Sequence, residues 1–407
     1  MSSSATSPRT RGGPASELPR SRASQMKSSS LKRAAVSRRT AAPLAAGPAL
    51  PPGIGLPPGI GPLAHLASVI QRLEADWAGR RLLVLTHRTP DPDALGAMLG
   101  VSFLLEKGFG LATEIASAGR IFRAENLAMV GELGLDFEDA ERLNHADFAG
   151  IFLVDTQPGF GHTTLPRDLP VIAVFDHHRP PASGRWKGAL PPHYDVRLEI
   201  GATSTMIYGY LRDAGLVLDE RTATALCCGV RFDTADLSRD PTELDSEAFY
   251  ETFRLANRVK LARIQQPVLP RAYYRDLYRS LSRARRYGST VIGVLGRIEN
   301  PESVAEMADF FLRMEGCRWS LVGGAFEDHY HLSLRTVGPD AYPMLEHVLA
   351  GEGSFGGRGP VAGGQVGLET GDWGEIQRLE RRLRKRALAL VDPAERTGSR
   401  GLPLTHP

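Results

Sequence analysis

The chain has 407 residues, of which 42% are hydrophobic and 23% charged, with 49 Lys and Arg against 46 Asp and Glu. These proportions are ordinary for a globular protein and exclude collagen-like, coiled-coil and wholly disordered chains. No apolar run approaches the ~18 residues of a transmembrane helix, so we expect no membrane span. The three cysteines are too few for a disulfide framework or a zinc site, which favours a reducing, cytoplasmic location.

The N-terminal segment, residues 1–63, is predicted to be a disordered tail rich in Ser, Pro and Arg. Its prolines remove backbone donors and its glycines add backbone entropy, and no apolar block of a signal peptide follows the basic residues. Residues 1–50 hold nine basic side chains and one acid, so the rest of the chain has a net charge of −5. The tail is interpreted as a solvated extension, as the product of a start codon before Met26, or as an arm for nucleic acid or a partner.

The predicted elements then follow in chain order, with short apolar strands between amphipathic helices. A helix at 64–77 is followed by a strand at 81–87, a helix at 93–108, strands at 151–156 and 171–178, and helices at 201–215 and 222–230. Continuous apolar strands are typical of a parallel sheet that is buried on both faces. We therefore expect an α/β catalytic domain over 64–245, followed by a helical linker over 246–286.

A second pattern begins near residue 289 and predicts a smaller α/β domain over 287–395. Its expected elements are a strand at 289–298, a helix at 301–316, a strand pair at 318–326 and 329–337, a helix at 342–351, a glycine-rich loop at 351–367 and a helix at 373–391. Residues 396–407 are expected to be frayed. The predicted fold is thus two α/β domains joined by a helical linker.

Four segments of the first domain place acids and histidines where a strand is expected to end. They contribute His87, Asp91 and Asp93; Asp155; Asp176, His177 and His178; and Asp233 with Asp236. Ligands in open α/β sheets bind at the carboxyl ends of strands. Carboxylates mixed with imidazoles, without a thiolate, suit Mn²⁺, Mg²⁺ or Fe²⁺. Two such ions bridged by a carboxylate generate hydroxide near neutral pH and clamp the oxygens of a phosphoryl displacement.

These motifs, HRTPDPDA, VDT, DHH and GVRFDT, resemble in order and spacing the DHH phosphoesterases. That superfamily includes RecJ-like exonucleases, oligoribonuclease and pAp phosphatases, cyclic di-adenylate phosphodiesterases and manganese-dependent inorganic pyrophosphatases. The GATST segment at 201–205 is similar too, and the resemblance extends over about residues 80–370.

The resemblance implies a role for each matching residue. His87, Asp91 and Asp155 would bind one metal ion. Asp93, Asp155, His177 and Asp233 would bind the other, with Asp155 bridging the two. His178 would face the substrate phosphate as a general acid or electrostatic stabiliser, and Asp176 would orient a neighbouring imidazole. Arg231 and Asp236 are interpreted as a surface ion pair.

The second domain resembles the DHH-associated C-terminal domain in two pieces. In HLSLRT, Ser333 and Arg335 would bind a phosphate. In GGRGPVAGG, backbone groups would approach phosphate oxygens at Gly356, Gly357, Gly363 and Gly364. The family usually has Gly-Gly-His here, and this chain has Arg358 in place of the histidine. Arginine retains a phosphate donor with a permanent charge but does not titrate near neutral pH.

The predicted function is therefore a two-metal, Mn-type phosphoesterase that hydrolyses short oligonucleotides or nucleotides such as pAp. One alternative is an exopolyphosphatase or pyrophosphatase that acts on inorganic phosphate chains. Another is a non-enzymatic nucleotide-sensing or nucleic-acid-binding module. Whether the protein forms a homodimer is left open. The role of one aromatic and basic cluster is also left open, because it is suited either to base stacking or to packing between domains. Its members are Tyr273, Tyr274, Tyr278, Arg271, Arg275 and Arg279.

Overall fold

The fold is given by a computed structural model, which describes residues 61–135, 138–180, 188–239, 241–391, 393 and 401–404. The segment expected to be a tail lies outside these residues as far as residue 60. Its last residues differ from the expectation, because helix α1 (Pro62–Leu73) begins within them, with proline at its first position. Among the described residues, no helix is both long and apolar enough to span a membrane.

The first sheet has six parallel strands in the order β3-β2-β1-β4-β5-β6. Their bounds are β1 Arg81–Leu85, β2 Thr113–Ser117, β3 Glu138–Asp139, β4 Phe148–Val154, β5 Val171–Asp176 and β6 His193–Val196. Every residue of β4 is buried, as expected for an apolar strand in the middle of a parallel sheet. The predicted parallel sheet is therefore confirmed. It gains three strands, β2, β3 and β6, that the sequence did not indicate.

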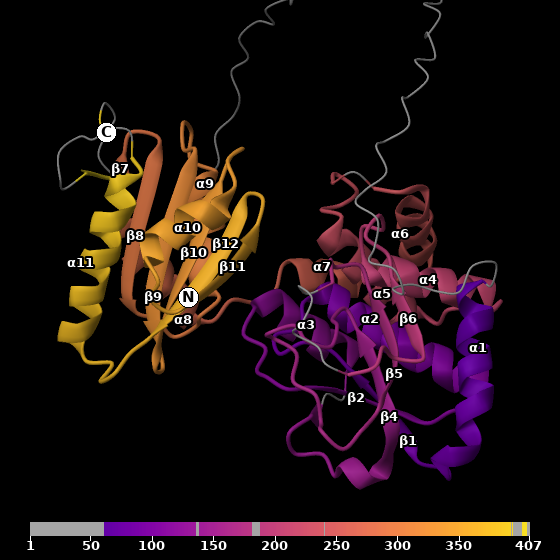
Figure 1. Cartoon of the computed structure of the whole chain (residues 1–407). Helices are drawn as coiled ribbons and strands as arrows, with labels where there is room; N and C mark the ends of the chain where they lie inside the picture. The colour runs from indigo at the N-terminus through magenta and orange to yellow at the C-terminus, as the bar shows by residue number, and fades with distance from the viewer. Residues whose placement is uncertain are drawn as a thin grey trace, which may run out of the picture. The chain divides into compact units, whose positions relative to one another are not determined.

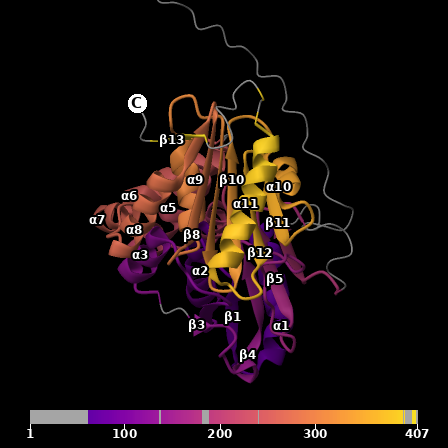
Figure 2. The same cartoon turned by 90° about the vertical axis from the view of Figure 1, so that its left-hand side faces the viewer.

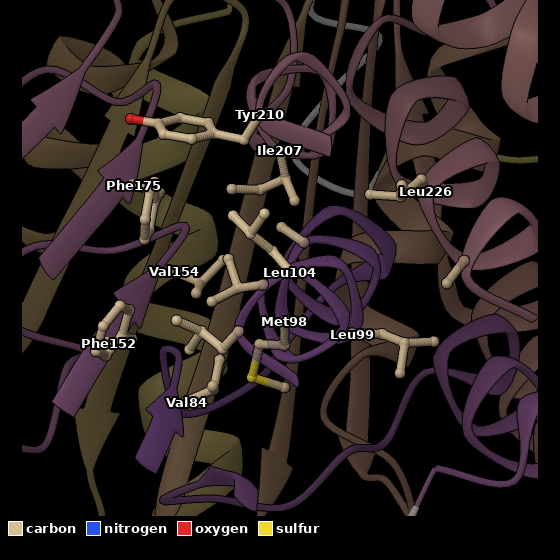
Figure 3. Packing of buried hydrophobic residues seen from close by; sticks show 14 of the residues in the cluster. Val84, Met98, Leu99, Leu104, Phe152, Val154, Phe175, Ile207, Tyr210 and Leu226 are labelled. Carbon is tan, nitrogen blue, oxygen red and sulfur yellow. The ribbon is translucent and has the colours of Figure 1, made fainter. Parts of the chain in front are cut away.

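Helix α2 (Pro92–Phe103) is the central helix of this part of the chain, and its residues from Pro92 to Val101 are buried. It packs against α4 (Thr203–Asp213) and α5 (Glu220–Asp233) and ends in a π-turn at Leu104–Gly108. Figure 3 shows side chains of the strands, such as Val84 and Phe152, facing Met98 of α2. Because α2 follows β1 directly, this packing holds its N-terminus at the carboxyl end of the sheet.

The helical segment expected to link two domains is divided between two hydrophobic cores. Helices α6 (Glu243–Leu255) and α7 (Arg258–Gln265) pack on α5, and α7 also packs on α3 (Ala124–Leu133). Helix α8 (Arg271–Arg283) packs instead on β8 (Thr290–Arg297) and α9 (Ser303–Leu312). The stretch between the two groups of helices is thus only residues 266–270.

The second sheet is mixed, with seven strands in the order β11-β12-β10-β9-β8-β7-β13, and only β8 and β9 pair in parallel. Its other strands are β7 Arg285–Tyr287, β9 Trp319–Phe326, β10 His329–Thr336, β11 Ser354–Arg358, β12 Val361–Gly367 and β13 Leu402–Pro403. Val291 and Leu295 pack with α9, whereas Ile292 belongs to the cluster of α10 (Ala341–Leu349) and α11 (Trp373–Ala389). Helices therefore cover both faces, and Figures 1 and 2 show α11 lying along this sheet.

The two-part α/β fold is thus as predicted, with two corrections in the second part. The segment 351–367, expected to be a glycine-rich loop, forms the hairpin of β11 and β12. Within the terminal stretch expected to be frayed, Leu402–Pro403 pair with β7, whereas residues 394–400 and 405–407 lie outside the described part of the chain.

Candidate metal centre

The structure gathers the predicted site residues at the carboxyl ends of three neighbouring strands. His87 follows β1, Asp155 directly follows β4, and His177 directly follows β5. Asp91 and Asp93 form the first turn of α2 after β1. Asp233 was expected at the end of a strand, but it is the last residue of α5, which approaches the same edge as a helix.

Three overlapping groups of side chains have candidate ligand atoms within 4.8 Å of one another. The groups are His87, Asp91 and Asp155; Asp93, His177 and Asp233; and Asp155, His177 and His178. Asp155 also links the first two groups, because its Oδ2 lies 3.7 Å from His87 Nε2 and its Oδ1 lies 3.7 Å from His177 Nε2. The structure thus brings together the residues that the family resemblance assigns to two metal ions and a shared carboxylate.

Asp155 has an unusual backbone that aims its buried side chain into this cluster. Its φ of 56° lies in the left-handed region, which a non-glycine residue adopts at a cost. The conformation is held by a hydrogen bond from its amide to Phe175 O (2.9 Å), and Oδ1 accepts a bond from the Thr203 hydroxyl (2.8 Å). Such strain is common at functional sites, since the surrounding structure has to enforce it.

The two carboxylates of the DPD turn are fixed by two helix N-termini. Asp91 caps α2, where its Oδ1 accepts the amides of Asp93 and Ala94, each at 3.0 Å. Asp93 is fully buried and accepts the amides of Thr203 (2.7 Å) and Ser204 (2.8 Å) at the start of α4. Burial and the charges of Asp155 and Asp233 raise the pKa of Asp91 to about 7 and that of Asp93 well above its ordinary value.

The imidazole of His177 lies among carboxylates in the arrangement that a metal ligand requires. Its Nδ1 lies 3.2 Å from the carbonyl of Ile200, which can only accept, so Nδ1 carries the hydrogen. Nε2 faces carboxylates, with Asp233 Oδ2 at 3.0 Å and Asp93 Oδ2 at 3.9 Å. Burial lowers the pKa of His177, but the contact with Asp233 and the charges of Asp155 and Asp93 outweigh it and raise the pKa well above its ordinary value. Nε2 is buried and makes no hydrogen bond within the described residues. A divalent cation between these groups fits this donor set of carboxylates and imidazole.

His178 is held differently, by the carboxylate of Asp176. Oδ1 of Asp176 lies 2.9 Å from Nδ1 of His178 and also accepts the amide of His177 at 2.8 Å. Burial lowers the pKa of His178, but the Asp176 hydrogen bond and the charges of Asp155 and Asp176 outweigh it and raise the pKa to about 9. The ring is half-exposed to solvent. Because its pKa is about 9, it carries a positive charge near neutral pH.

Replacing Asp176 with asparagine is expected to lower the pKa of His178 by about one unit or more, because the asparagine amide keeps the shape but loses the charge. The measurement is an NMR titration of the His178 ring in metal-free protein. Asp147→Asn, at an exposed aspartate, is the matched control and should leave the titration where it is. An unchanged His178 titration in Asp176→Asn would show that the carboxylate does not set this pKa.

Several residues that support the site were not singled out from the sequence. Gln157 is fully buried and donates to Asp176 Oδ2 (2.6 Å) and to the carbonyl of His178 (2.8 Å), while the Tyr194 hydroxyl donates to its Oε1. The ring of His162 lies 5.4 Å from that of His87. Gln157 directly follows the VDT motif, which was the one available signal, whereas Tyr194 and His162 become visible only in three dimensions.

Gly229 lets α5 approach the buried carboxylate of Asp93. A Cβ at this position would lie 2.1 Å from Ser204 Oγ and 2.9 Å from Asp93 Oδ1. We expect Gly229→Ala to destabilise the protein by about 1–3 kcal/mol and to weaken Mn²⁺ binding, since the helix or Asp93 has to move. Urea unfolding and a metal titration measure the two effects.

The matched control is Gly131→Ala in α3, where an added Cβ meets nothing within 4 Å. That change should be neutral or stabilise the protein by up to about 1 kcal/mol, as alanine does in a helix. Equal stabilities for the two variants would contradict this account of the packing around Asp93.

The second sheet aligns three of the seven predicted phosphate-binding residues in one row. Ser333 on β10 pairs with Gly363 on β12, which pairs with Gly356 on β11. Arg335 lies two residues along β10, and its guanidinium bonds Asp309 Oδ1 (2.7 Å) and Ser333 Oγ (2.6 Å). The residues that line one pocket of this sheet include Ser333, Arg335, Gly356, Gly363 and Gly364.

Three other residues singled out from the sequence lie outside this row of paired residues. Gly357 is not among the described residues that line this pocket, and an added Cβ would meet Val361 O at 2.5 Å. Arg358 ends β11, but its side chain lies outside the described part of the structure. Asp236 forms the predicted ion pair with Arg231, with Nε and Oδ1 2.6 Å apart.

Comparison with known proteins finds relatives that match part of the chain. No family model matches the chain. It is 31% identical over 280 residues to the uncharacterized protein MJ1633 of Methanocaldococcus jannaschii, a match that covers 68% of this chain and 56% of that protein. It is 26% identical over 164 residues to a probable manganese-dependent inorganic pyrophosphatase of Streptococcus agalactiae. That match covers 40% of this chain and 50% of the pyrophosphatase. The chain thus spans about half the length of the curated relatives it matches.

A solved structure shares the fold of both sheets. An exopolyphosphatase-related protein from Bacteroides fragilis superposes with a TM-score of 0.62 and 16% identity, covering 83% of this chain and 100% of that one. The fold and the cluster define an α/β protein with carboxylates and imidazoles gathered where its parallel strands end. Its four motifs lie in order along this fold, with their acids and histidines in this cluster, as the resemblance to the DHH phosphoesterases implies.

Proposed function

We propose that the protein is a metal-dependent phosphohydrolase with two divalent cations, and that these are Mn²⁺, which suits its donor set of carboxylates and imidazoles. The observation that carries this proposal is the placement of buried His177 Nε2, which faces the carboxylates of Asp233, Asp155 and Asp93 at 3.0, 3.7 and 3.9 Å. His87, Asp91 and Asp155 would hold one ion, and Asp93, Asp155, His177 and Asp233 the other. Bound there, the ions would supply a nucleophilic hydroxide at neutral pH and neutralise charge on the phosphoryl group.

The chain's own residues would position and protonate the substrate. His178 is charged, half-exposed and oriented through Nδ1 by Asp176, so Nε2 is available to donate a proton to the leaving oxygen. On the second sheet, Arg335 and Ser333 would bind a substrate phosphate beside the row of glycines, where no side chain prevents approach to the backbone. Gly357 and Arg358 belong to the same proposed phosphate-binding hairpin.

The proposed substrates are short oligonucleotides or nucleotides such as pAp. A second candidate, inorganic phosphate chains, is supported by Arg358 in place of the histidine that the family usually has, because a simple anion requires charge more than base contacts. The relatives named as a pyrophosphatase and an exopolyphosphatase-related protein favour the same candidate. Cys227, Cys228 and Cys317 are free thiols, which supports our proposal that the protein acts in the cytoplasm.

The test is hydrolysis of four compounds with Mn²⁺, and with EDTA as the control: pAp, an RNA of two to five residues, pyrophosphate and polyphosphate. Hydrolysis of any of them that stops in EDTA supports the proposal, and the fastest reaction identifies the substrate class. Release of mononucleotides favours the first candidate, and faster release of phosphate from polyphosphate favours the second. Failure to hydrolyse all four compounds in Mn²⁺ would contradict the proposed reaction on these substrates.

A further inference from the structure

Helix α8 presents an arginine- and tyrosine-rich face that the proposed reaction does not use. In its 13 residues are four arginines and three tyrosines against a single acid, Asp276, which is buried. Tyr273 packs with the hydrophobic cluster below α8. Tyr274 and Tyr278 do not, since they are 58% and 73% exposed. The structure therefore assigns packing to one tyrosine of the predicted cluster and leaves two in solvent.

The two exposed tyrosines lie on one face of the helix. Residues four apart are neighbours on an α-helix, with Cα atoms separated by about 6 Å along its axis. Each exposed ring is directly followed by an arginine, Arg275 or Arg279, and Arg271 precedes them by one turn on the same face. Rings and guanidinium groups thus alternate along the helix. We call residues Arg271, Tyr274, Arg275, Tyr278 and Arg279 the α8 strip.

Contacts with Glu299, with the end of β8 and within α8 hold two guanidinium groups of the strip at the surface. Arg275 pairs with Glu299, and its side chain stays 57% exposed. Arg279 bonds Asp276 Oδ1 (3.4 Å) and the carbonyl of Arg297 (3.3 Å) and stays 40% exposed. Such partners reduce the entropy that a ligand would otherwise have to remove from long side chains. Both guanidinium groups keep donors for an anion, because each has five N–H groups.

We propose that the α8 strip binds single-stranded nucleic acid, with bases stacked on Tyr274 and Tyr278 and phosphates paired with the arginines. Stacking platforms interleaved with positive charge are what an unpaired strand requires, because its bases offer flat faces and its backbone one charge per nucleotide. A partner helix would instead need an apolar face, and an acidic polypeptide would leave the rings unused. The proposal goes beyond hydrolysis, since this binding requires neither the metal centre nor cleavage.

The chain offers a matched control, an exposed tyrosine without a row of arginines beside it. Tyr250 on α6 is 64% exposed, and its neighbours on the helix are Glu247, Glu251 and Arg254. Arg254 pairs with Glu251, and Arg212 of α4 pairs with Glu247. Tyr250→Ala therefore removes the same ring from a surface without an excess of positive charge.

The experiment measures fluorescence anisotropy of labelled 20-nucleotide oligo(U) and oligo(dT) with the full chain in EDTA. We expect Tyr274→Ala and Tyr278→Ala each to weaken binding about tenfold, as loss of one stacked base does. Tyr250→Ala should change affinity less than twofold. The basic residues of 1–50 are present in every variant, so differences between variants report on the α8 strip. Thermal melting of each variant shows that it is folded.

Charge is tested separately through the salt dependence. Arg271→Gln should lower the slope of log affinity against log salt by about 0.7, the value for one phosphate of a single strand. The tyrosine variants should leave that slope unchanged. Crosslinking with 5-iodouridine in the oligonucleotide, followed by mass spectrometry, should identify Tyr274 or Tyr278.

Three results would overturn the proposal: tyrosine variants that bind like the unmodified chain, the same loss in Tyr250→Ala, or equally tight binding of poly-glutamate at this face. The last would make the strip a surface for acidic polypeptides. Because all binding is measured in EDTA, these results do not depend on whether the metal centre hydrolyses phosphate esters, and failure of either proposal leaves the other standing.

Discussion

Asp155→Asn is expected to lower Mn²⁺-dependent hydrolysis about a thousandfold or more, because metal catalysis supplies several kcal/mol that one shared carboxylate makes possible. Among the residues that the structure describes, Asp155 is the one whose side-chain oxygens lie within 4 Å of both His87 and His177. An amide of the same size has no charge and does not bridge two cations as a carboxylate does. Steady-state rates at saturating Mn²⁺ measure the loss.

Asparagine is chosen because it should preserve the backbone at this position. It tolerates the left-handed region better than other non-glycine residues, and the φ of Asp155 is 56°. Its side-chain oxygen can still accept the Thr203 hydroxyl. Asp213→Asn, at the exposed end of α4, is the control and should keep full activity. A rate for Asp155→Asn within tenfold of that control would remove this carboxylate from the mechanism.

The sequence could predict β1, β4 and β5 because each is a continuous apolar run that is buried on both faces. It did not predict β2, whose sequence is TEIAS, or β6, whose sequence is HYDV. All four residues of β6 are buried, and the polar groups are satisfied by distant partners: His193 Nε2 lies 2.8 Å from the Tyr210 hydroxyl. A strand stabilised by such tertiary contacts has no local hydrophobic pattern.

The glycine-rich hairpin illustrates the same limit. Glycine disfavours strands, so the segment from Gly351 to Gly367 indicated a loop. In the structure β12 pairs along its whole length with β10, from His329 opposite Gly367 to Arg335 opposite Val361. Backbone pairing with an apolar neighbouring strand outweighs the weak intrinsic preference, and it places the predicted glycines Gly356 and Gly363 beside Ser333.

The candidate site was more predictable than its supports, and the reason is geometric. The motifs stand where strands end, and parallel strands bring those ends to one edge whatever the loops between them do. The supports depend on helix packing instead. Thr203 and Ser204 lie 110 and 111 residues from Asp93, which they contact, and Gly229 matters because α5 lies against both. A local sequence pattern does not indicate contacts between residues that are so far apart in the chain.

Mn²⁺ is expected to raise the melting temperature of the protein by about 5–10 °C at a concentration one hundred times its dissociation constant, from about 2.7 kcal/mol of linked binding. The folded chain holds Asp91, Asp93, Asp155 and Asp233 together, whereas the unfolded chain does not. Binding therefore stabilises the folded state alone. Differential scanning calorimetry in Mn²⁺ and in EDTA measures the shift, and Asp155→Asn should show a much smaller one.

The shift should be larger at pH 8 than at pH 6, and the sign follows from the raised pKa values. In the metal-free fold, Asp91 titrates at about 7 against an ordinary 3.8, and His178 at about 9 against 6.5. Between pH 4 and 9 the folded state therefore binds more protons than the unfolded state, so the metal-free protein loses stability as pH rises. A cation bound by Asp91 replaces the proton of that carboxyl group, so Mn²⁺ binding becomes more favourable as the pH rises through about 7. Groups far from the centre contribute equally with and without Mn²⁺ and cancel in the difference. A shift that is equal at both pH values, or larger at pH 6, would mean that Mn²⁺ binds outside this cluster of carboxylates.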